Sequence, residues 1–209
     1  MKTHKLKEIL QLHKKWLEGS KGRKADLRDA NLCGVYLLDA NLRGANLRGA
    51  DLRDADLRDA NLYHANLYRA DLRGADLEHA DLGDTNLLDA DLRCASLLDT
   101  SLRGADLRDA DLRDASLYRA DLRDSDLRDA NLRGARIRRV IGDGKRIKTV
   151  QAGWHIAYTE DVMAIGCQQH TLEQWFSFSD RRINRMSTDA LQWWKKHKPI
   201  LKVLTGFED

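Results

Sequence analysis

The residues whose types and spacing could do chemistry lie near the C-terminal end of the chain. Cys167 and His170 have the spacing of half a zinc site, and His155 and His197 are two further candidate ligands. A structural zinc site needs a second matching pair, which this sequence does not contain. The same cysteine and histidine could form a nucleophile and its base, but on a strand-to-helix turn they need not face each other. We therefore predict no metal, no cofactor and no enzymatic activity.

A second set of reactive groups is a row of carboxylates at regular spacing. It consists of Asp51, Asp71, Asp91 and Asp111, and an arginine follows each aspartate two residues later. Carboxylates in an enclosed pair could do acid–base chemistry, but these recur every twenty residues in a polar sequence. Their function depends on the element that carries them.

That element is an uninterrupted repeat of five residues. Residues 25–134 form 22 consecutive units, and the third residue of every unit is Leu, from Leu27 to Leu132. The first residue is Ala in 18 units, and the second is mostly Asp, Asn or Ser. The repeat has a single register, without an insertion.

A period of five excludes both simple secondary structures. On an α-helix each leucine would be turned by about 140° from the last, so the leucines would surround the helix. On a flat strand an odd period would send successive leucines to opposite faces. The remaining solution is a chain that turns a corner in each unit, with four short sides to a coil of about twenty residues. The sequence thus predicts an all-β solenoid of about five and a half coils, with leucine in its centre.

The pattern A-(D/N)-L-x-x over residues 25–134 resembles the pentapeptide-repeat family. The resemblance covers about half of the chain, and its motif is specific because the register holds through all the units. It implies a right-handed quadrilateral β-helix. It does not settle function, because members of the family do many different things.

The outward residues of such a rod allow two interpretations. Aspartates and arginines in neighbouring rows would neutralise each other on a solvated face. Alternatively, the row Asp51, Asp71, Asp91 and Asp111 would imitate the phosphates of duplex DNA, as the resemblance to the quinolone-resistance group implies for a topoisomerase partner. Leucine in place of phenylalanine, the absence of loops and the arginine rows depart from that group. Aromatic or apolar interruptions such as Tyr63, Tyr68 and Leu88 could mark a contact patch or be tolerated substitutions.

The N-terminal segment, residues 1–24, is predicted to be a capping helix. Residues 3–18 have apolar residues at helical spacing, including Leu6 and Leu10, and Gly19 ends the pattern. An uncapped solenoid would expose its core and unpaired backbone groups. A basic amphipathic helix could instead lie on a membrane or on nucleic acid, but the first coil would then be left open.

The composition changes after residue 139, and we predict a small α+β domain over residues 140–209, after a β-helix over residues 25–139. Two or three short strands should be followed by a helix from a capping box at Thr171 and Gln174 to about Met186, and by a second helix to Leu204 that Pro199 kinks or splits. Four of the five tryptophans lie here and are the candidate partner-binding residues: Trp154, Trp175, Trp193 and Trp194. A compact domain, an enlarged cap and a dimerisation element all remain open.

Charge and cysteine content indicate the cellular compartment in which we expect the protein. The formal net charge is +3, but residues 1–24 carry +6, residues 25–134 carry −8 and residues 135–209 carry +5. No segment is apolar enough for a membrane or a secretory signal, and three scattered cysteines indicate reduced thiols, so we expect a soluble cytoplasmic protein of bacterial or phage type.

The sequence thus favours a non-enzymatic interaction protein, a rigid rod displaying a C-terminal domain that binds a protein partner or forms a homodimer through its helices. We expect no direct binding of nucleic acid and no membrane contact. A DNA mimic acting on a DNA-handling enzyme is the alternative, and an enzyme or metal site in residues 140–209 is the third.

Overall fold

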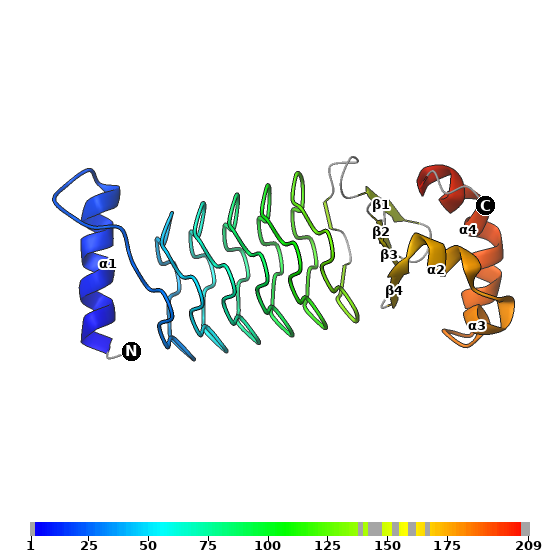
Figure 1. The fold of residues 1–209 in the computed structure, drawn as a ribbon, viewed down its shortest axis with the longest axis horizontal. Helices are drawn as coiled ribbons and strands as arrows, with labels where there is room; N and C mark the ends of the chain where they lie inside the picture. The colour runs from blue at the N-terminus through cyan, green and yellow to red at the C-terminus, as the bar shows by residue number, and fades with distance from the viewer. Residues whose placement is uncertain are drawn as a thin grey trace.

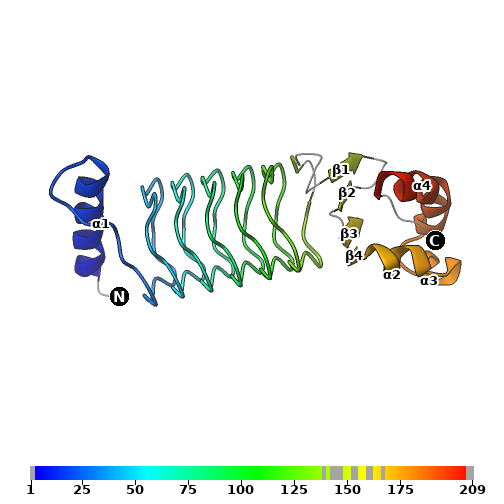
Figure 2. The same cartoon turned by 45° about the horizontal axis from the view of Figure 1, so that its top comes forward.

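The protein is an elongated rod with helices at both ends (Figure 1 and Figure 2). The computed structural model describes residues 3–137, 140–141, 148–151, 155–158, 162–165 and 168–205. One helix, α1 (Thr3–Leu17), lies across the N-terminal end of the stacked coils, and a sheet with three helices follows their C-terminal end. Within the described ranges, no helix has the length and apolar character needed to cross a membrane.

The coils of the repeat are joined by parallel β-bridges between residues twenty positions apart, which begin at Asp26↔Asn46. In the next coil, the Leu52 N–H donates to the Asp71 carbonyl at 2.7 Å, and the Asp71 N–H donates to the Ala50 carbonyl at 2.9 Å. Four units therefore complete one turn of the chain. The bridges join single residues, so the sides of the coil are short and no strand of several residues forms in the repeat.

A left-handed residue forms each corner of the coil. The fifth residue of every unit has a positive φ, from +52° at Asp84 to +75° at Gly134. The turn is closed by a bond from the following unit, for example from the Ala55 N–H to the Leu52 carbonyl at 3.1 Å. Sixteen of the 22 corner residues carry a side chain, and for such residues the left-handed region costs about 1–2 kcal/mol. The packing of the core must offset that cost.

Leucine fills the centre of the coils and alanine lies at the corners. Each leucine of the repeat from Leu42 to Leu117 is fully buried, and most first-position alanines are buried beside them. Three units carry a hydroxyl residue in place of alanine, and these hydroxyls bond to leucine carbonyls of the coil. The bonds are Thr85 Oγ1 to Leu82 at 2.6 Å, Thr100 Oγ1 to Leu77 at 2.8 Å and Ser125 Oγ to Leu122 at 2.8 Å.

Helix α1 packs against the first coil through its apolar face. Leu6 belongs to the same buried cluster as the leucines of the repeat, and Ile9 and Leu10 pack against that cluster. The chain then folds back along the helix, where a Cβ on Gly22 would lie 2.3 Å from the Leu12 carbonyl oxygen. This close approach explains why a glycine occupies the loop between the helix and the repeat.

The C-terminal part has a second buried cluster, separate from that of the repeat, which includes Trp175 and Trp194. Its sheet is an antiparallel meander in the order β1-β2-β3-β4, with strands β1 (Lys148–Gln151), β2 (His155–Tyr158), β3 (Val162–Ile165) and β4 (Gln168–Thr171). Three helices follow, α2 (Leu172–Ser177), α3 (Asp180–Asn184) and α4 (Ala190–Thr205).

The secondary structure of this part differs from the sequence prediction in two ways. Four strands form where two or three were expected, and the helix predicted to reach Met186 ends at Ser177. Phe178 is extended there, and the Ser179 side chain accepts a hydrogen bond from the Arg182 N–H, so a new helix begins. The predicted capping box at Thr171 is present. Pro199 lies inside α4, which is not split. The turns expected near residues 142–144 and at Gly153 fall outside the described residues.

Candidate functional site

The aspartate row on one side of the rod is paired with its arginines along its whole length. Arg53 donates from Nε and Nη2 to the two carboxylate oxygens of Asp51, both at 2.7 Å, and its Nε lies 3.7 Å from Asp71 of the next coil. The same arrangement recurs up the rod, in the pairs Arg73 with Asp71 and Asp91, Arg93 with Asp91 and Asp111, and Arg113 with Asp111. We call these residues the Asp–Arg ladder.

The carboxylates of the ladder stay ionised, and the neighbouring arginines compensate their negative charge. Hydrogen bonding from the arginine of the same unit lowers the pKa of Asp51, Asp71 and Asp111 below the ordinary range. Each aspartate also accepts a bond from a backbone N–H two residues later, such as Arg53 to Asp51 at 3.3 Å. The potential of the row therefore alternates over short distances. Each ladder carboxylate therefore has two structural roles, because it fixes the local turn and also holds the arginine side chain.

A shallow groove of about 540 Å³ runs beside the ladder. It is lined by the four ladder arginines and by the corner residues of the same units, Asp54, Gly74, Cys94 and Asp114. Cys94 is exposed and free, as is Cys33. Both signs of charge line the groove, so it offers no concentrated site for an anion or a cation.

The predicted partner-binding tryptophans do not form one surface. Trp175 and Trp194 are each 2% exposed and lie in the core of the C-terminal part, with ring centroids 5.6 Å apart. The indole N–H of Trp175 donates to the Met163 carbonyl at 2.6 Å. Trp193 is partly buried and stacks on His197 at 4.5 Å. Trp154 lies outside the described residues. Of the described three, Trp193 is therefore the tryptophan that reaches the surface.

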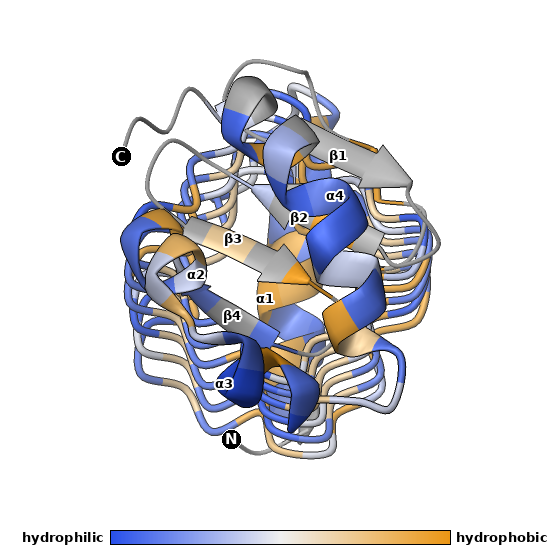
Figure 3. Cartoon of the chain, turned by 90° about the vertical axis from the view of Figure 1, so that its right-hand side faces the viewer, coloured by the Kyte–Doolittle hydropathy of each residue, from blue (hydrophilic) through white to orange (hydrophobic). Residues whose placement is uncertain are grey.

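Helices α3 and α4 carry several exposed basic side chains. Figure 3 shows mostly hydrophilic residues in α3, and both hydrophilic and hydrophobic residues in α4. Lys195 pairs with Asp180 at 3.0 Å and links the two helices. The exposed residues of these helices include four further cationic side chains, Arg181, Arg182, Arg185 and Lys196. The two helices thus present several basic side chains, and α4 also carries the Trp193–His197 stack.

The histidines considered as metal ligands or bases have structural surroundings. His170 contacts the edges of Trp175 and Phe178, and burial and the charge of Arg182 lower its pKa. Nδ1 of His197 lies 2.8 Å from the Trp193 carbonyl. Cys167 and the side chain of His155 are outside what the structure describes, so the proposed Cys–His pair is not tested. Within the described residues, no cluster of three or more potential metal ligands occurs.

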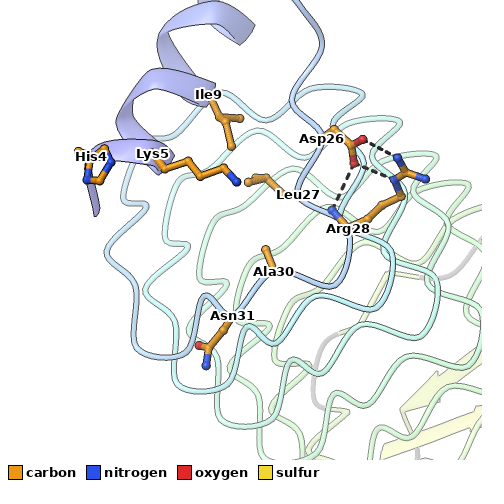
Figure 4. Close-up of a pocket in the computed structure, with 8 residues that line it drawn as sticks. All are labelled: His4, Lys5, Ile9, Asp26, Leu27, Arg28, Ala30 and Asn31. Carbon is orange, nitrogen blue, oxygen red and sulfur yellow. Dashed lines mark hydrogen bonds and ion pairs between the residues drawn. The ribbon is translucent and has the colours of Figure 1, made fainter. Parts of the chain in front are cut away.

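A cleft that the sequence did not indicate lies where α1 meets the first coil. It has a volume of about 420 Å³, and Figure 4 shows Lys5 and Ile9 of the helix opposite Leu27 of the repeat. Asp26 at its rim is held by Arg28 through two side-chain bonds of 2.7 and 2.8 Å. The cleft exists because a straight helix crosses a four-sided coil and cannot follow its rim.

The comparisons agree with the repeat seen in the structure. The family model for pentapeptide repeats matches eight copies over residues 36–74, 70–109 and 105–141, which is about half of the chain. Among curated proteins, no significant match was found.

Three solved structures illustrate the likeness. HetL, a pentapeptide repeat protein involved in heterocyst differentiation regulation in the cyanobacterium Nostoc sp. strain PCC 7120, is 36% identical, with 58% of this chain and 63% of HetL covered and a TM-score of 0.45. Rfr23 from the cyanobacterium Cyanothece 51142 is 25% identical over 63% of this chain and 92% of its own, with a TM-score of 0.35. QnrB1, a plasmid-mediated fluoroquinolone resistance protein, is 22% identical over 60% and 70%, with a TM-score of 0.32.

The match to HetL spans less than two thirds of that protein, so its role does not transfer with the repeat. The family fold is a right-handed quadrilateral β-helix, and the bridges at a spacing of twenty residues give the four-sided coil that such a fold requires. Since the family model matches half of the chain and the coils have the geometry of the repeat, this protein belongs to the pentapeptide-repeat family.

Proposed function

We propose that the chain is a non-enzymatic interaction protein, in which a rigid rod displays a C-terminal unit that binds a protein partner. The observation that carries this proposal is the Trp193–His197 stack, which lies on a helix with exposed lysines and on a unit with a core of its own. Aromatic and arginine residues are the side chains most enriched at the centres of protein interfaces. The exposed lysines of α4 and arginines of α3 favour a partner with an acidic surface.

The rod acts as a spacer with fixed dimensions. Each coil bonds to the coil on either side, so bending would break several backbone hydrogen bonds at once. Helix α1 closes the N-terminal end as a cap, and the burial of Leu6 with the leucines of the repeat supports that role. The C-terminal unit begins after the repeat and has a separate buried cluster.

The alternative of duplex mimicry has weaker support. A mimic needs carboxylates that can meet the cationic groove of a DNA-handling enzyme, whereas the ladder aspartates are each bound by an arginine of the same unit. Releasing them would cost both ion pairs and local turns. We therefore place recognition at the C-terminal unit, with a second copy of the chain as the simplest partner after a different protein.

The experiment compares full-length baits captured from a bacterial lysate at low and moderate salt and read by mass spectrometry. The variant Trp193→Ala removes the aromatic stack, and Gln192→Ala changes the exposed neighbouring residue as its matched control. Loss of one specific partner with Trp193→Ala alone would support the proposal. If the partner is lost when all four ladder aspartates are changed to asparagine, and is retained by Trp193→Ala, duplex mimicry would replace the present proposal. Sedimentation velocity of the same variants separates a homodimer from a foreign partner.

A further inference from the structure

Asparagine replaces the aspartate of the repeat in five adjoining units on two neighbouring sides of the rod. The bridges Asn41↔Asn61, Asn46↔Asn66 and Asn66↔Asn86 stack these residues on successive coils. The units of Asn41 and Asn46 are consecutive in the chain, so the two columns meet at one corner of the coil. The five asparagines thus form one continuous surface on a repeat whose net charge is −8.

The side chains on this surface present hydrogen-bond donors. Asn46 Oδ1 accepts from the Arg48 N–H at 3.3 Å, and Asn66 Oδ1 accepts from the Tyr68 N–H at 3.0 Å. The carbonyl oxygens of the other three are used in the same way. Their NH₂ groups have no hydrogen-bond partner in the described part of the chain. Within that part, the one polar side-chain atom buried without a partner is Nε2 of His13, so these amides are open to solvent.

Two arginines of the same surface lack the carboxylate that holds the ladder arginines. Arg43 and Arg48 follow asparagines, and neither has an ion pair with any described residue. Their guanidinium groups lie over the rings of Tyr63 and Tyr68 at 5.7 and 5.6 Å. Stacking fixes the plane of a guanidinium while its N–H edges stay available to an acceptor. We call the five asparagines with Arg43 and Arg48 the amide–arginine patch.

Carboxylates also border the patch. Asp26 and Asp81 continue the two columns below Asn46 and above Asn61, and the Asp29 carboxylate lies beside Gly49. Among the nearest carboxylates, Asp84 lies 3.9 Å from His64, and Asp89 pairs with Arg69 at 3.2 Å. Arg69 also lies over the ring of Tyr68 at 4.9 Å. Towards the N-terminus, the Nζ of Lys24 would lie 3.6 Å from a Cβ on Gly44, beside the patch. Among the described residues, Arg43 and Arg48 thus remain the cations of this surface without a carboxylate at ion-pair distance.

An acceptor-rich partner could be a protein or a nucleic acid, and two features favour a protein. The ring of Tyr68 is flanked by two guanidinium groups, and that of Tyr63 lies against Gly83, where a Cβ would be 2.9 Å from the ring. These rings offer poor platforms for bases. The patch is also only about 10 Å long, at roughly 4.8 Å per coil. A nucleic acid would continue along the rod over aspartates such as Asp106 and Asp121, which repel phosphates.

We propose that the amide–arginine patch binds a short acidic segment of a partner protein, whose carboxylates bond to Arg43, Arg48 and the free asparagine amides. This surface is on the rod and is independent of the Trp193 surface proposed above. The two surfaces lie on different parts of the chain, so one partner could occupy each. The rod is then a second recognition element and not only a spacer.

The test uses the full chain and a fluorescein-labelled peptide of alternating aspartate and glycine, with binding followed by fluorescence anisotropy. The variant Asn41→Asp/Asn46→Asp gives Arg43 and Arg48 the carboxylate partners that the ladder arginines have, in a residue type the repeat already uses. The control Asn31→Asp/Asn131→Asp adds the same charge on another side of the rod. We expect the first variant to weaken binding by about ten-fold or more, the loss of one or two charge-assisted bonds, and the control by less than about three-fold.

A second pair of variants tests the arginines directly. Arg43→Gln/Arg48→Gln should weaken peptide binding, and Arg53→Gln/Arg58→Gln, which removes the same charge from the paired rows, should weaken it much less. Circular dichroism checks that all variants fold. Absence of peptide binding by the wild type, or equal losses in test and control variants, would refute the proposal. Tighter binding of a labelled single-stranded oligonucleotide through the same arginines would assign the patch to nucleic acid instead. Self-association that the Asn41→Asp/Asn46→Asp variant abolishes would assign it to a second copy of the chain.

Discussion

The backbone N–H of Ala25, the first residue of the repeat, donates a hydrogen bond of 3.0 Å to Nδ1 of His13 in α1. His13 is fully buried and stacks on Trp16 at 5.4 Å. The bond requires a neutral imidazole with Nδ1 unprotonated, because a protonated ring would place a donor against a donor. Burial, and to a smaller extent the charge of Lys24, lower the pKa of His13 below the ordinary 6.5. The attachment of α1 to the rod is thus tied to the charge of one histidine.

The first prediction concerns the pH dependence of stability. The pKa of His13 is lower in the folded chain than in the unfolded chain, so the unfolded chain takes up the proton first as pH falls. The contribution of His13 is therefore complete above pH 6.5 and is lost as pH falls from 6.5 through the folded-state pKa. His13→Asn keeps an acceptor without this titration and should show a smaller loss than the wild type. Urea unfolding on either side of that pH measures the difference.

His170 titrates in the same window, because its pKa is lowered as well. Both the wild type and His13→Asn contain His170, so the contribution of His170 to the pH dependence cancels when the two proteins are compared. An equal loss of stability in both proteins would mean that His13 does not hold the cap in the way described.

The second prediction concerns the Asp–Arg ladder. Asp71→Asn retains the acceptor for the Arg73 N–H but loses the ion pairs to Arg73 and Arg53. These pairs are partly exposed, so we expect the free energy of unfolding to fall by about 0.2–1 kcal/mol for each pair. The difference from wild type should shrink in high salt because exposed charges are screened. Asp71→Ala also removes the acceptor and should cost more at every salt concentration. A loss independent of salt would contradict the ionic account.

The third prediction concerns the corners of the coil. Asp109 has a φ of +57°, in the left-handed region that a β-branched side chain avoids. Asp109→Val should therefore lower the free energy of unfolding by roughly 1–2 kcal/mol. Asp109→Gly serves as the matched control, since glycine adopts this conformation freely and should leave stability unchanged or slightly higher. Equal effects of the two substitutions, measured by urea unfolding, would show that the corner conformation is not the cause.

The fourth prediction separates the two cores. Trp175→Phe removes the indole N–H that bonds to the buried Met163 carbonyl, at a cost of about 1–3 kcal/mol. The loss should appear in hydrogen exchange of residues 155–201 and leave the repeat protected, because the clusters are separate. Trp193→Phe keeps an aromatic ring on His197 and is expected to change exchange much less. Loss of protection in the repeat as well would mean that the cores unfold together.

The repeat could be predicted from the sequence because a period of five admits few backbone paths. Once leucine recurs every fifth residue, a common interior requires a corner in each unit, and the burial of Leu42 to Leu117 follows. The left-handed corners were not predicted, since Asp, Arg, His and Cys occupy most of them and only six are glycine. The local signal there is weak, and the tertiary structure imposes the conformation.

The candidate sites were harder to predict because the type of a residue does not specify whether its side chain is buried or exposed. Trp175 and Trp194 are of a residue type common at binding surfaces, yet their rings pack into a core together with aliphatic and aromatic side chains such as Ile165 and Phe176. The interruptions at Tyr63 and Tyr68 allow two interpretations from sequence, a contact patch or tolerated substitutions, and their relation to Arg43 and Arg48 is a contact between residues twenty positions apart. Only the period of the coil, combined with the identity of the second residue in each unit, would have found it.

The bridge spacing of twenty residues has a consequence for how such a chain can change its length. The core accepts an added unit of five residues, because any unit supplies one leucine and one corner. Such an insertion advances every later unit by one side, so each column of surface residues after it breaks and rejoins a different column. Twenty residues must be added together for the columns to stay in phase. The core therefore does not depend on which side of the coil a unit occupies. A surface built across several coils does depend on it, because its columns align only if the number of preceding units is unchanged or changes by four.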